Sequence, residues 1–474
     1  MIIKPGGTRR RKMKRHRTSC LFPAFFAVVL AMCLAASSFG QTQSPSPAAR
    51  VPGPTASPTP PAPSPATVLV EPSETSEQET IYGLQGVLVE TLDGAAVSAQ
   101  SADEAFNPAS AIKLGTAFVA LRTLGPEHRF TTGVWTDGSL DKLTGTINGN
   151  LYISGRDPSF HFEHAVMIAR QLNSLGIRTV TGDLVIGPAF TMNFNWSARR
   201  SGSQLYDTLD SALRSGEATR AWLYERNALG DKKSLETVPS VAVMGEVRVE
   251  PVVANAKLLL SHRSSRLVDI LKVLLCYSNN FMAERLGDSV GGLQSVRRQL
   301  IETLGLTPEQ LQMASLSGLG INRASPRTMM KIFRALREEL RKYRLSTTDI
   351  MPVAGVDPGT LETRFSDPPW RGSVIAKTGT LVRTDGGASS LVGQMRTASG
   401  ATLLFVIMNR RGNVTRFRSN QDYLVMQILT SRGGPMAFKY TPHLLTMRLS
   451  DTQNSFTASD DEFEPVLKSS SAPR

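Results

Sequence analysis

The sequence predicts an α+β fold, in which helices and strands are mixed along the chain. Two segments carry apolar residues at helical spacing, one running from Leu114 to Leu124 and the other from Leu267 to Leu275. A third segment, 374–381, is an apolar run typical of a β-strand. With 41% hydrophobic and 20% charged residues, the composition excludes a chain that is disordered or fibrous throughout.

Residues 1–40 are predicted to be a secretory signal peptide or an uncleaved membrane anchor. Eight Lys and Arg side chains in residues 1–20 precede an apolar stretch from Leu21 to about Leu34 and a group of small residues. The apolar and small residues together are just long enough to span a bilayer. These eight charges account for most of the net charge of +13, so we expect no nucleic-acid binding and no membrane contact outside this segment.

Two further segments have compositions that cannot form a core. Residues 41–66 contain nine prolines among Ser, Ala and Thr, which predicts an extended linker. Residues 437–474 are expected to be a partly disordered C-terminal extension, because the chain is polar and weakly acidic from about Ser450 onwards.

The first motif with a chemical interpretation is Ser110 with Lys113. Pro108 and Ala109 precede Ser110 at a predicted helix start, and Lys113 lies one turn further on the same face. A serine needs a neighbour to take its proton, and a desolvated lysine close to another cation can be neutral and do so. The alternative is a serine that caps the helix beside a solvated lysine.

Two more motifs follow along the chain. Ser278-Asn279-Asn280 interrupts two helical segments and can point a hydroxyl and an amide into a cleft, or it is a simple turn between helices. Lys377-Thr378-Gly379 lies in the predicted strand 374–381, where Lys and Thr can hold a carboxylate. The glycine is expected to leave room for an extended peptide along the strand edge. An ordinary edge strand is the alternative.

The order S-x-x-K, S-x-N, K-T-G is typical of penicillin-binding proteins and serine β-lactamases. Beyond these motifs, the sequence resembles the D-alanyl-D-alanine carboxypeptidase/endopeptidase family of penicillin-binding protein 4. The segments that carry the resemblance are 106–110, 151–158, 261–264 and 352–361. Residues 190–250 match least well, and Ser315–Leu319 departs from the family, which tends to have Asp-Gly before Ser-Gly-Leu. We expect this departure to alter local packing without touching the residues assigned to chemistry.

The resemblance implies a penicillin-binding-protein/β-lactamase-like transpeptidase fold, an antiparallel sheet flanked by helices, with an inserted smaller domain. The catalytic domain would comprise residues 67–130 and 258–436, and the insert residues 131–257. Segments 145–153 and 181–186 give the insert β character, with a helical pattern from Ala165 to Leu175 between them.

The resemblance also implies the role of each site residue. Ser110 would attack the penultimate D-alanine carbonyl of a peptidoglycan stem peptide, Lys113 would take its proton, and Ser278 would relay a proton to the leaving amine. Asn280 would orient the substrate, and Lys377 and Thr378 would bind its carboxylate. The N–H groups of Ser110 and Thr380 would form an oxyanion hole, and Gly379 would leave room for the peptide. Asp157 would contact the stem peptide's side-chain amine, or is a turn residue before Pro158.

The predicted function is that of a periplasmic or otherwise extracytoplasmic serine-type D-Ala-D-Ala carboxypeptidase/endopeptidase, inhibited covalently by β-lactams and needing no cofactor or metal. A serine β-lactamase and a non-catalytic peptidoglycan-binding descendant of the fold are the alternatives. His161-Phe162-Glu163-His164 matches no zinc-peptidase pattern, and we expect surface histidines there. No G-x-S-x-G surrounds a serine, and Cys276 is expected to be a buried helical thiol.

Overall fold

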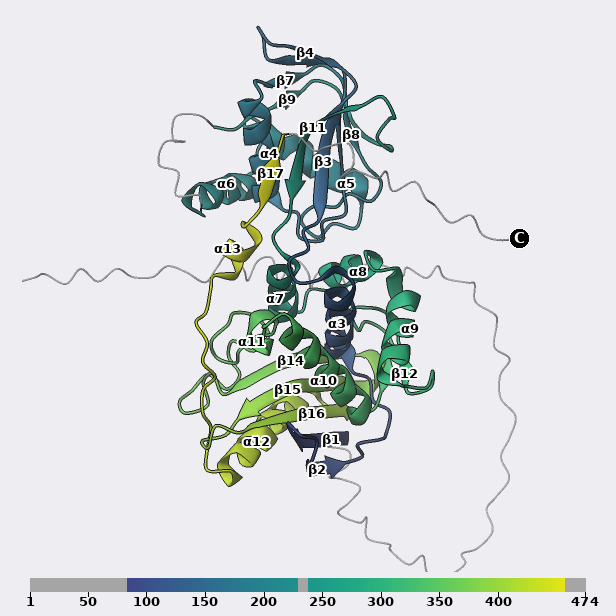
Figure 1. Ribbon diagram of the computed structural model, residues 1–474, viewed down its shortest axis with the longest axis vertical. Coiled ribbons are helices and arrows are strands. Elements are labelled where there is room, and N and C mark those ends of the chain that lie inside the picture. The colour runs from purple at the N-terminus through teal and green to yellow at the C-terminus, as the bar shows by residue number, and fades with distance from the viewer. Residues whose placement is uncertain (1–82, 229–237, 457–474) are drawn as a thin grey trace, which may run out of the picture. The chain divides into compact units, whose positions relative to one another are not determined.

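The computed structural model describes residues 83–228 and 238–456 (Figure 1). The predicted signal or anchor at 1–40 and the predicted linker at 41–66 lie outside these residues. Within them, no helix combines the length and the apolar character needed to cross a bilayer.

A five-stranded antiparallel sheet forms the centre of the catalytic domain. Its strands lie in the order β14 (Val374–Leu381), β15 (Ala388–Arg396), β16 (Thr402–Arg410), β1 (Leu84–Thr91) and β2 (Ala96–Gln100). The bounds of β14 confirm the strand predicted at 374–381. β14 is an edge of this sheet, and on its outer side an isolated antiparallel bridge joins Ile375 to Val353 in the described part of the chain.

Helices cover both faces of this sheet (Figure 1). One face packs against helices that include α3 (Lys113–Leu124), α7 (Leu267–Tyr277), α8 (Asn280–Asp288), α9 (Gly292–Leu304), α10 (Pro326–Lys342) and α11 (Thr347–Ile350). The opposite face packs against α12 (Val414–Ser431). Alternation along each strand divides the apolar residues between the two cores: Val392 points to the first and Leu391 to the second.

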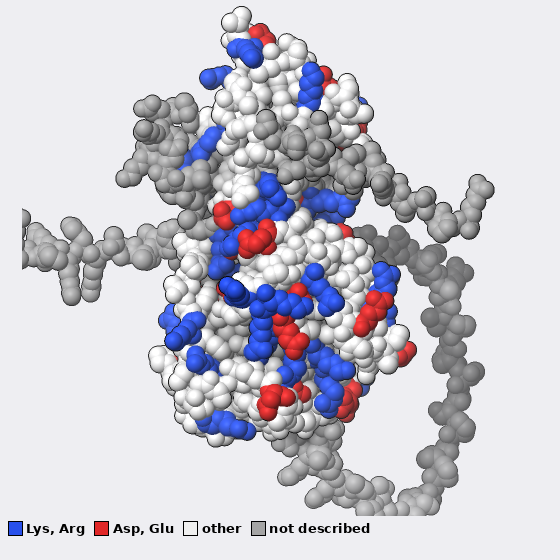
Figure 2. All heavy atoms as spheres, in the orientation of Figure 1, with Lys and Arg blue, Asp and Glu red and all other residues white. Residues whose placement is uncertain are grey.

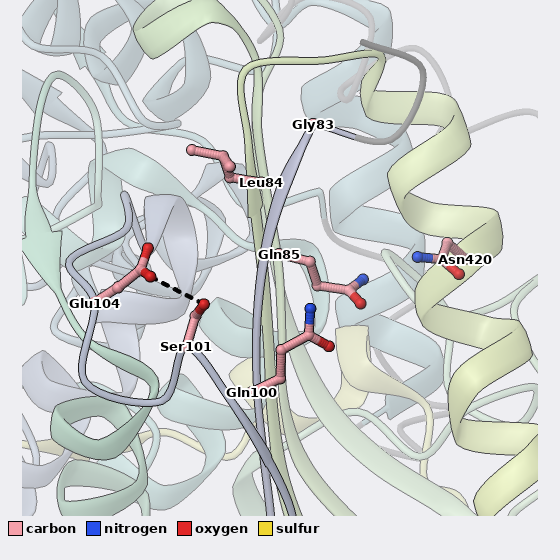
Figure 3. Close-up of a pocket in the computed structure, with 7 residues that line it drawn as sticks. All are labelled: Gly83, Leu84, Gln85, Gln100, Ser101, Glu104 and Asn420. Atoms are coloured by element: carbon pink, nitrogen blue, oxygen red, sulfur yellow. Dashed lines mark hydrogen bonds between the residues drawn. The ribbon is translucent and has the colours of Figure 1, made fainter. Parts of the chain in front are cut away.

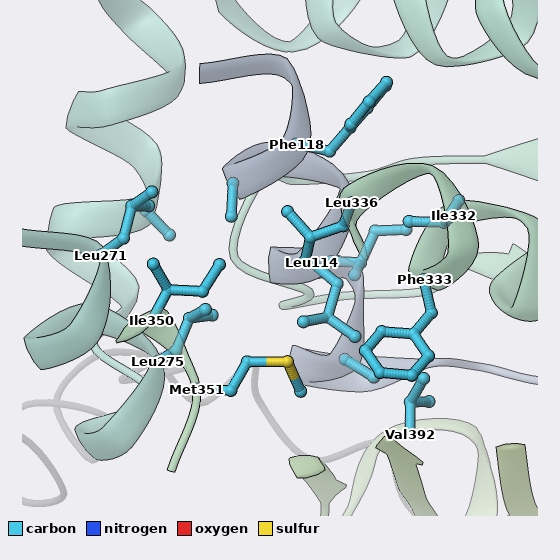
Figure 4. Packing of buried hydrophobic residues seen from close by; sticks show 14 of the residues in the cluster. Leu114, Phe118, Leu271, Leu275, Ile332, Phe333, Leu336, Ile350, Met351 and Val392 are labelled. Atoms are coloured by element: carbon cyan, nitrogen blue, oxygen red, sulfur yellow. The ribbon is translucent and has the colours of Figure 1, made fainter. Parts of the chain in front are cut away.

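The larger core lies where α3, α7 and α10 converge on the sheet (Figure 4). The side chains labelled there are Leu114, Phe118, Leu271, Leu275, Ile332, Phe333, Leu336, Ile350, Met351 and Val392. The helical spacing of Leu114, Phe118 and Leu121 places all three side chains in this core. Gly125, which precedes Pro126, ends α3 with a positive φ of 80°.

The inserted domain contains two sheets. The larger has the order β10 (Val247–Val249), β8 (Leu184–Ile186), β6 (Leu151–Gly155), β3 (Thr131–Thr136), β11 (Lys257–Arg263) and β17 (Gln453–Ser455). The smaller has the order β4 (Ser139–Asp141), β5 (Thr146–Asn148), β7 (Thr179–Val180) and β9 (Ala242–Val243). Helices α4 (Phe162–Ser174), α5 (Ala198–Leu209) and α6 (Gly216–Ala228) complete the domain.

Two features of the insert differ from the sequence prediction. Its sheet includes β11 as far as Arg263, so the chain returns to the catalytic domain later than the predicted boundary at residue 257. After α13 (Leu445–Leu449), β17 pairs with β11, although its polar composition predicts disorder from Ser450. The strand forms because the edge of β11 supplies backbone partners that composition does not reveal.

Candidate active site

The nucleophile candidate lies on a tight turn at the start of a helix. Ser110 belongs to the 3₁₀ turn η1 (Ala109–Ile112), which continues directly into α3, so the predicted helix start is confirmed. The preceding Ala109 has a positive φ of 47°, which is strained for a residue with a Cβ. Asn107 Oδ1 accepts a hydrogen bond from the Ala109 N–H at 3.1 Å and holds this conformation.

Lys113 is completely buried and contacts Ser110. Its Nζ lies 2.9 Å from Ser110 Oγ, 2.7 Å from Asn280 Oδ1 and 2.6 Å from the Ser317 carbonyl oxygen. Burial lowers the pKa of Lys113 well below its usual value, and the nearby charge of Lys377 lowers it further. The alternative of a solvated lysine is therefore wrong.

The partners of Lys113 fix the direction of its lone pair. The Asn280 and Ser317 oxygens can only accept hydrogen bonds, so they take the two N–H groups of a neutral amine. In that neutral form the lone pair would face the third partner, Ser110 Oγ at 2.9 Å, and the Ser110 hydroxyl would donate to Lys113. This arrangement is that of a general base beside its nucleophile.

Glu284 is a residue of this cluster that the sequence did not reveal. It lies one turn beyond Asn280 on α8, and its two carboxylate oxygens accept hydrogen bonds from the N–H groups of Ser317 at 2.9 Å and Leu316 at 3.3 Å. The segment Ser315–Leu319 reaches the site through Ser317, in the Ser-Gly-Leu part that matches the family, whose carbonyl accepts a hydrogen bond from Lys113.

The second motif lies where α7 ends and α8 begins. Ser278 has a left-handed conformation with φ 56° and ψ 39°, and the Asn279 side chain caps α8 by accepting from the Met282 N–H at 3.0 Å. The structure thus brings Asn280 to Lys113. It does not bring the Ser278 hydroxyl within hydrogen-bond distance of any partner among the described residues.

Lys377 of the third motif is also fully buried. Burial lowers its pKa to about 7, and its Nζ donates to the Thr378 carbonyl at 2.7 Å. Thr378 is buried beside it, and Thr380, two residues along β14, accepts a hydrogen bond from Arg418 at 2.8 Å. Arg418, on α12, is a second neighbour of the site that the motifs did not indicate.

Gly379 has a different neighbour from the one predicted. A Cβ at this position would lie 2.4 Å from the Pro108 carbonyl oxygen and 2.1 Å from Ser390 Oγ. The missing side chain therefore lets β14 pack against the turn that carries Ser110, and the room expected for a substrate peptide is filled by that turn.

Asp157 lies in the inserted domain, and no contact joins it to the Ser110 cluster in the described chain. Its Oδ1 accepts hydrogen bonds from the N–H and hydroxyl of Ser159, at 2.8 and 2.6 Å. Burial raises the pKa of Asp157. These contacts favour its interpretation as a turn residue before Pro158, and its contact with a substrate amine stays a prediction.

Two other predicted residues are buried. His164 is inaccessible to solvent, so the expectation of surface histidines is wrong for this position; its Nδ1 accepts from the His161 N–H and its Nε2 lies 2.8 Å from the Leu449 carbonyl oxygen. Cys276 is buried as predicted, and burial raises the pKa of its thiol to about 12. A thiol with that pKa is inert as a nucleophile at neutral pH.

A hollow elsewhere on the described surface lacks this combination of a serine and a lysine. A hollow of about 490 Å³ is lined by Gly83, Leu84, Gln85, Gln100, Ser101, Glu104 and Asn420 (Figure 3). Its carboxylate, Glu104, accepts a hydrogen bond from Ser101, and no lysine lines it. Figure 2 shows basic and acidic side chains mixed over the face in view. Across residues 83–228 and 238–456, no three His, Cys, Asp or Glu side chains are grouped to hold a metal ion.

The chain has a penicillin-binding protein 4-like α+β fold. It combines an antiparallel sheet between helices with an inserted domain, and a serine in contact with a buried lysine lies near the edge strand β14. The chain belongs to the D-Ala-D-Ala carboxypeptidase 3 (S13) family, whose model matches residues 73–198 and 230–428. The break in this match falls within the inserted domain.

Individual relatives agree with this assignment. A D-alanyl-D-alanine carboxypeptidase from an Actinomadura species is 26% identical, over 73% of this chain and 81% of its own length. Penicillin-binding protein 4 from Haemophilus influenzae, solved with a β-lactam, is similar in structure with a TM-score of 0.54 and 22% identity, over 73% of this chain and 98% of its own. A penicillin G-acylated predatory endopeptidase from Bdellovibrio bacteriovorus has a TM-score of 0.65 and 21% identity, over 78% of this chain and 100% of its own.

Proposed function

We propose that this protein is a serine-type D-Ala-D-Ala carboxypeptidase/endopeptidase that acts on peptidoglycan stem peptides and is inhibited by β-lactams. The observation that carries the proposal is the contact between Lys113 Nζ and Ser110 Oγ, in which the two other lysine partners leave the lone pair for the serine hydroxyl. Family membership supports the reaction class.

The reaction begins when Ser110 Oγ attacks the carbonyl of the penultimate D-alanine and passes its proton to Lys113. A bond forms between Oγ and the carbonyl carbon, and the bond to the leaving amine breaks as that amine receives a proton through Ser278. The resulting acyl-enzyme is hydrolysed by water, which restores Ser110. Because the leaving group is any D-amino acid amine, the same chemistry would release D-alanine or open a cross-link.

The oxyanion of the tetrahedral intermediate would be held by the N–H groups of Ser110 and Thr380. These residues come from η1 and β14, whose close approach depends on Gly379. Fixed N–H donors at this position stabilise the negative charge that develops on the carbonyl oxygen. A substrate peptide would lie along the outer edge of β14 beyond the isolated bridge between Ile375 and Val353.

Labelling by fluorescent penicillin tests this assignment directly. Ser110→Ala should abolish the covalent label while circular dichroism shows an unchanged fold. Ser174→Ala, which removes an exposed hydroxyl from the end of α4, is the matched control and should label normally. Persistent labelling of folded Ser110→Ala would refute the nucleophile.

Product analysis separates the activities. The protein without its first 40 residues is incubated with a pentapeptide and with cross-linked muropeptides, and the products are identified by mass spectrometry. Release of D-alanine or opening of the cross-link supports the peptidase proposal. Rapid β-lactam turnover without peptide cleavage favours a β-lactamase, and binding without any turnover favours a non-catalytic descendant.

We also propose that the folded part of the chain acts outside the cytoplasmic membrane, in the periplasm or an equivalent compartment. The basic and apolar pattern of residues 1–40 supports this location. A reporter that is active only after export, fused after Leu69, should be active. Activity of a reporter that works only in the cytoplasm would contradict the location.

A further inference from the structure

Arg418 places a positive charge next to the third motif. It lies on α12, and its Nη2 donates to Thr380 Oγ1 at 2.8 Å. Thr380 belongs to the edge strand β14, two residues beyond Thr378, so the guanidinium reaches the end of the strand along which the substrate is proposed to lie. One of its five N–H donors is used by Thr380, and within residues 83–228 and 238–456 the others have no hydrogen-bond partner, so they can serve a ligand.

Asp422, the acid whose charge acts on Arg418, forms its ion pair with a different arginine. Asp422, one turn further along α12, is held by Arg364, whose Nε and Nη2 lie 2.9 and 2.5 Å from Asp422 Oδ1. In the described part of the chain, Arg418 makes no ion pair, and its hydrogen bond is to a neutral hydroxyl. A guanidinium with free donors beside a peptide site is suited to bind a carboxylate.

Lys377 alone is poorly suited to that task. It is buried, and its Nζ donates to the Thr378 carbonyl of its own strand. Arg418 is exposed and remains protonated at neutral pH. The hydrogen bond from Arg418 also fixes the Thr380 oxygen as an acceptor, which leaves the Thr380 hydroxyl proton free to donate to a carboxylate.

We propose that Arg418 binds the α-carboxylate of the leaving D-amino acid, together with the Thr380 hydroxyl. This inference rests on the proposed function and adds Arg418 to the carboxylate site that the resemblance implies at the third motif. A terminal D-alanine carries this carboxylate. So does the D-centre of a cross-linking diamino acid, because its α-carboxylate lies beside the amine that leaves. Arg418 would therefore select free acids in both reactions and disfavour substrates whose carboxylate is amidated.

The test compares two peptides that differ only at this group. An acylated D-Ala-D-Ala peptide is offered as the free acid and as the C-terminal amide, and kcat/KM is measured for each. Arg418→Gln should lower kcat/KM for the acid by about 10- to 100-fold, the usual range for a hydrogen bond to a charged group, and leave the amide unchanged. Arg418→Lys should retain part of the preference, because it keeps the charge without the two-pronged geometry.

Arg416→Gln is the matched control, because Arg416 is exposed on the same helix and outside the site. It should leave both values of kcat/KM unchanged. An equal loss for acid and amide in Arg418→Gln, or no loss for the acid, would overturn the role of Arg418.

Penicillin acylation separates this outcome from a failure of the proposed function. The rate constants for acylation by a penicillin and by its methyl ester are compared in the same variants, which requires no peptidase activity. If the wild type cleaves no peptide but prefers the free penicillin acid through Arg418, the peptidase proposal fails and the carboxylate site stands. If that preference survives Arg418→Gln, the carboxylate site is refuted.

Discussion

Glu284 Oε1 accepts a hydrogen bond from the Ser317 N–H at 2.9 Å, and the carbonyl of that same Ser317 accepts one from Lys113 Nζ at 2.6 Å. The carboxylate thus holds the loop that positions the proposed base. Its negative charge also raises the pKa of Lys113, against the larger effects of burial and of Lys377. Glu284 is therefore a positioning residue with an electrostatic effect on the base.

Glu284→Gln should move the acid limb of penicillin acylation to lower pH. Removing the charge removes an influence that raises the pKa of Lys113, so the neutral amine persists at lower pH. The plateau rate should also fall, by roughly tenfold, because an amide oxygen cannot accept both backbone N–H groups in the same geometry. The measurement is the acylation rate constant as a function of pH.

Glu302→Gln on α9 is the matched control, since Glu302 is exposed. Its pH profile should coincide with that of the wild type. An acid limb of Glu284→Gln that stays in place or moves to higher pH would contradict the role assigned to Glu284.

Lys377→Met should stabilise the protein while impairing acylation. Lys377 has a folded-state pKa of about 7, below that of an unfolded lysine near 10.4. Between these values the unfolded chain binds more protons, so the free energy of unfolding rises with pH across this window. Below about pH 7 the charged group is buried at full cost, and the gain from methionine should be largest there and shrink towards about pH 10.

Thermal unfolding at several pH values measures this gain, with Lys439→Met as the exposed control. The control should change the unfolding temperature little at any pH. A Lys377→Met protein that is less stable than the wild type below pH 7 would show that the buried charge is compensated in the folded state.

Gly318→Ala should slow acylation by displacing the nucleophile. A Cβ at Gly318 would lie 2.0 Å from the Ala109 carbonyl oxygen and 2.8 Å from the Ser110 nitrogen, so the turn carrying Ser110 must shift. We expect a loss of about 100-fold in the acylation rate, typical of a misplaced reacting group. The measurement is the rate constant with fluorescent penicillin.

Gly176→Ala separates this effect from backbone strain. Gly176 has φ 83°, similar to the 89° of Gly318, but a Cβ there would meet no atom within 4 Å. Gly176→Ala should lose about 1 kcal/mol of stability from the left-handed conformation, measured by urea unfolding. Gly318→Ala should lose more, because the contact with the Ala109 carbonyl adds to the same backbone strain. If both slow acylation equally, the contact between Gly318 and the nucleophile turn is irrelevant.

The penicillin adduct should be long-lived. No Glu between Ser110 and Ser278 has Asn four residues later, which is the pattern of the glutamate that activates water in class A β-lactamases. Both oxygens of Glu284 are already taken by backbone N–H groups. After excess penicillin is removed, label should persist, and nitrocefin hydrolysis should be negligible. Fast, repeated nitrocefin turnover would move the protein to the β-lactamases.

The parts of the site that sequence reasoning found are those with local signals. Ser110 and Lys113 lie three residues apart, where η1 runs directly into α3. The bounds of β14 follow from its apolar run and the residues around it. Glu284 and Arg418 are ordinary charged residues on helices, and they reach the site through contacts with segments far away in the chain. Periodicity carries no information about such contacts, because it describes one element at a time.

The sequence pattern also does not indicate which polar side chains are buried. His164 lies on helix α4 and is buried. Its burial depends on the C-terminal segment, because the Leu449 carbonyl oxygen lies at hydrogen-bond distance from its ring Nε2. β17 is a further case, since its residues have low strand propensity and pair because β11 offers a free edge.

Because β17 pairs with β11, the inserted domain is not formed by one continuous segment of the chain. Residues 131–263 supply the other strands of its larger sheet, but the last strand arrives from the opposite end of the polypeptide, after the catalytic domain is complete. During synthesis, most of the insert therefore emerges from the ribosome long before β17, the last strand of its larger sheet, has been made. Transplanting the insert into another host, or ending the chain before Gln453, would leave β11 as an open edge available to a second molecule.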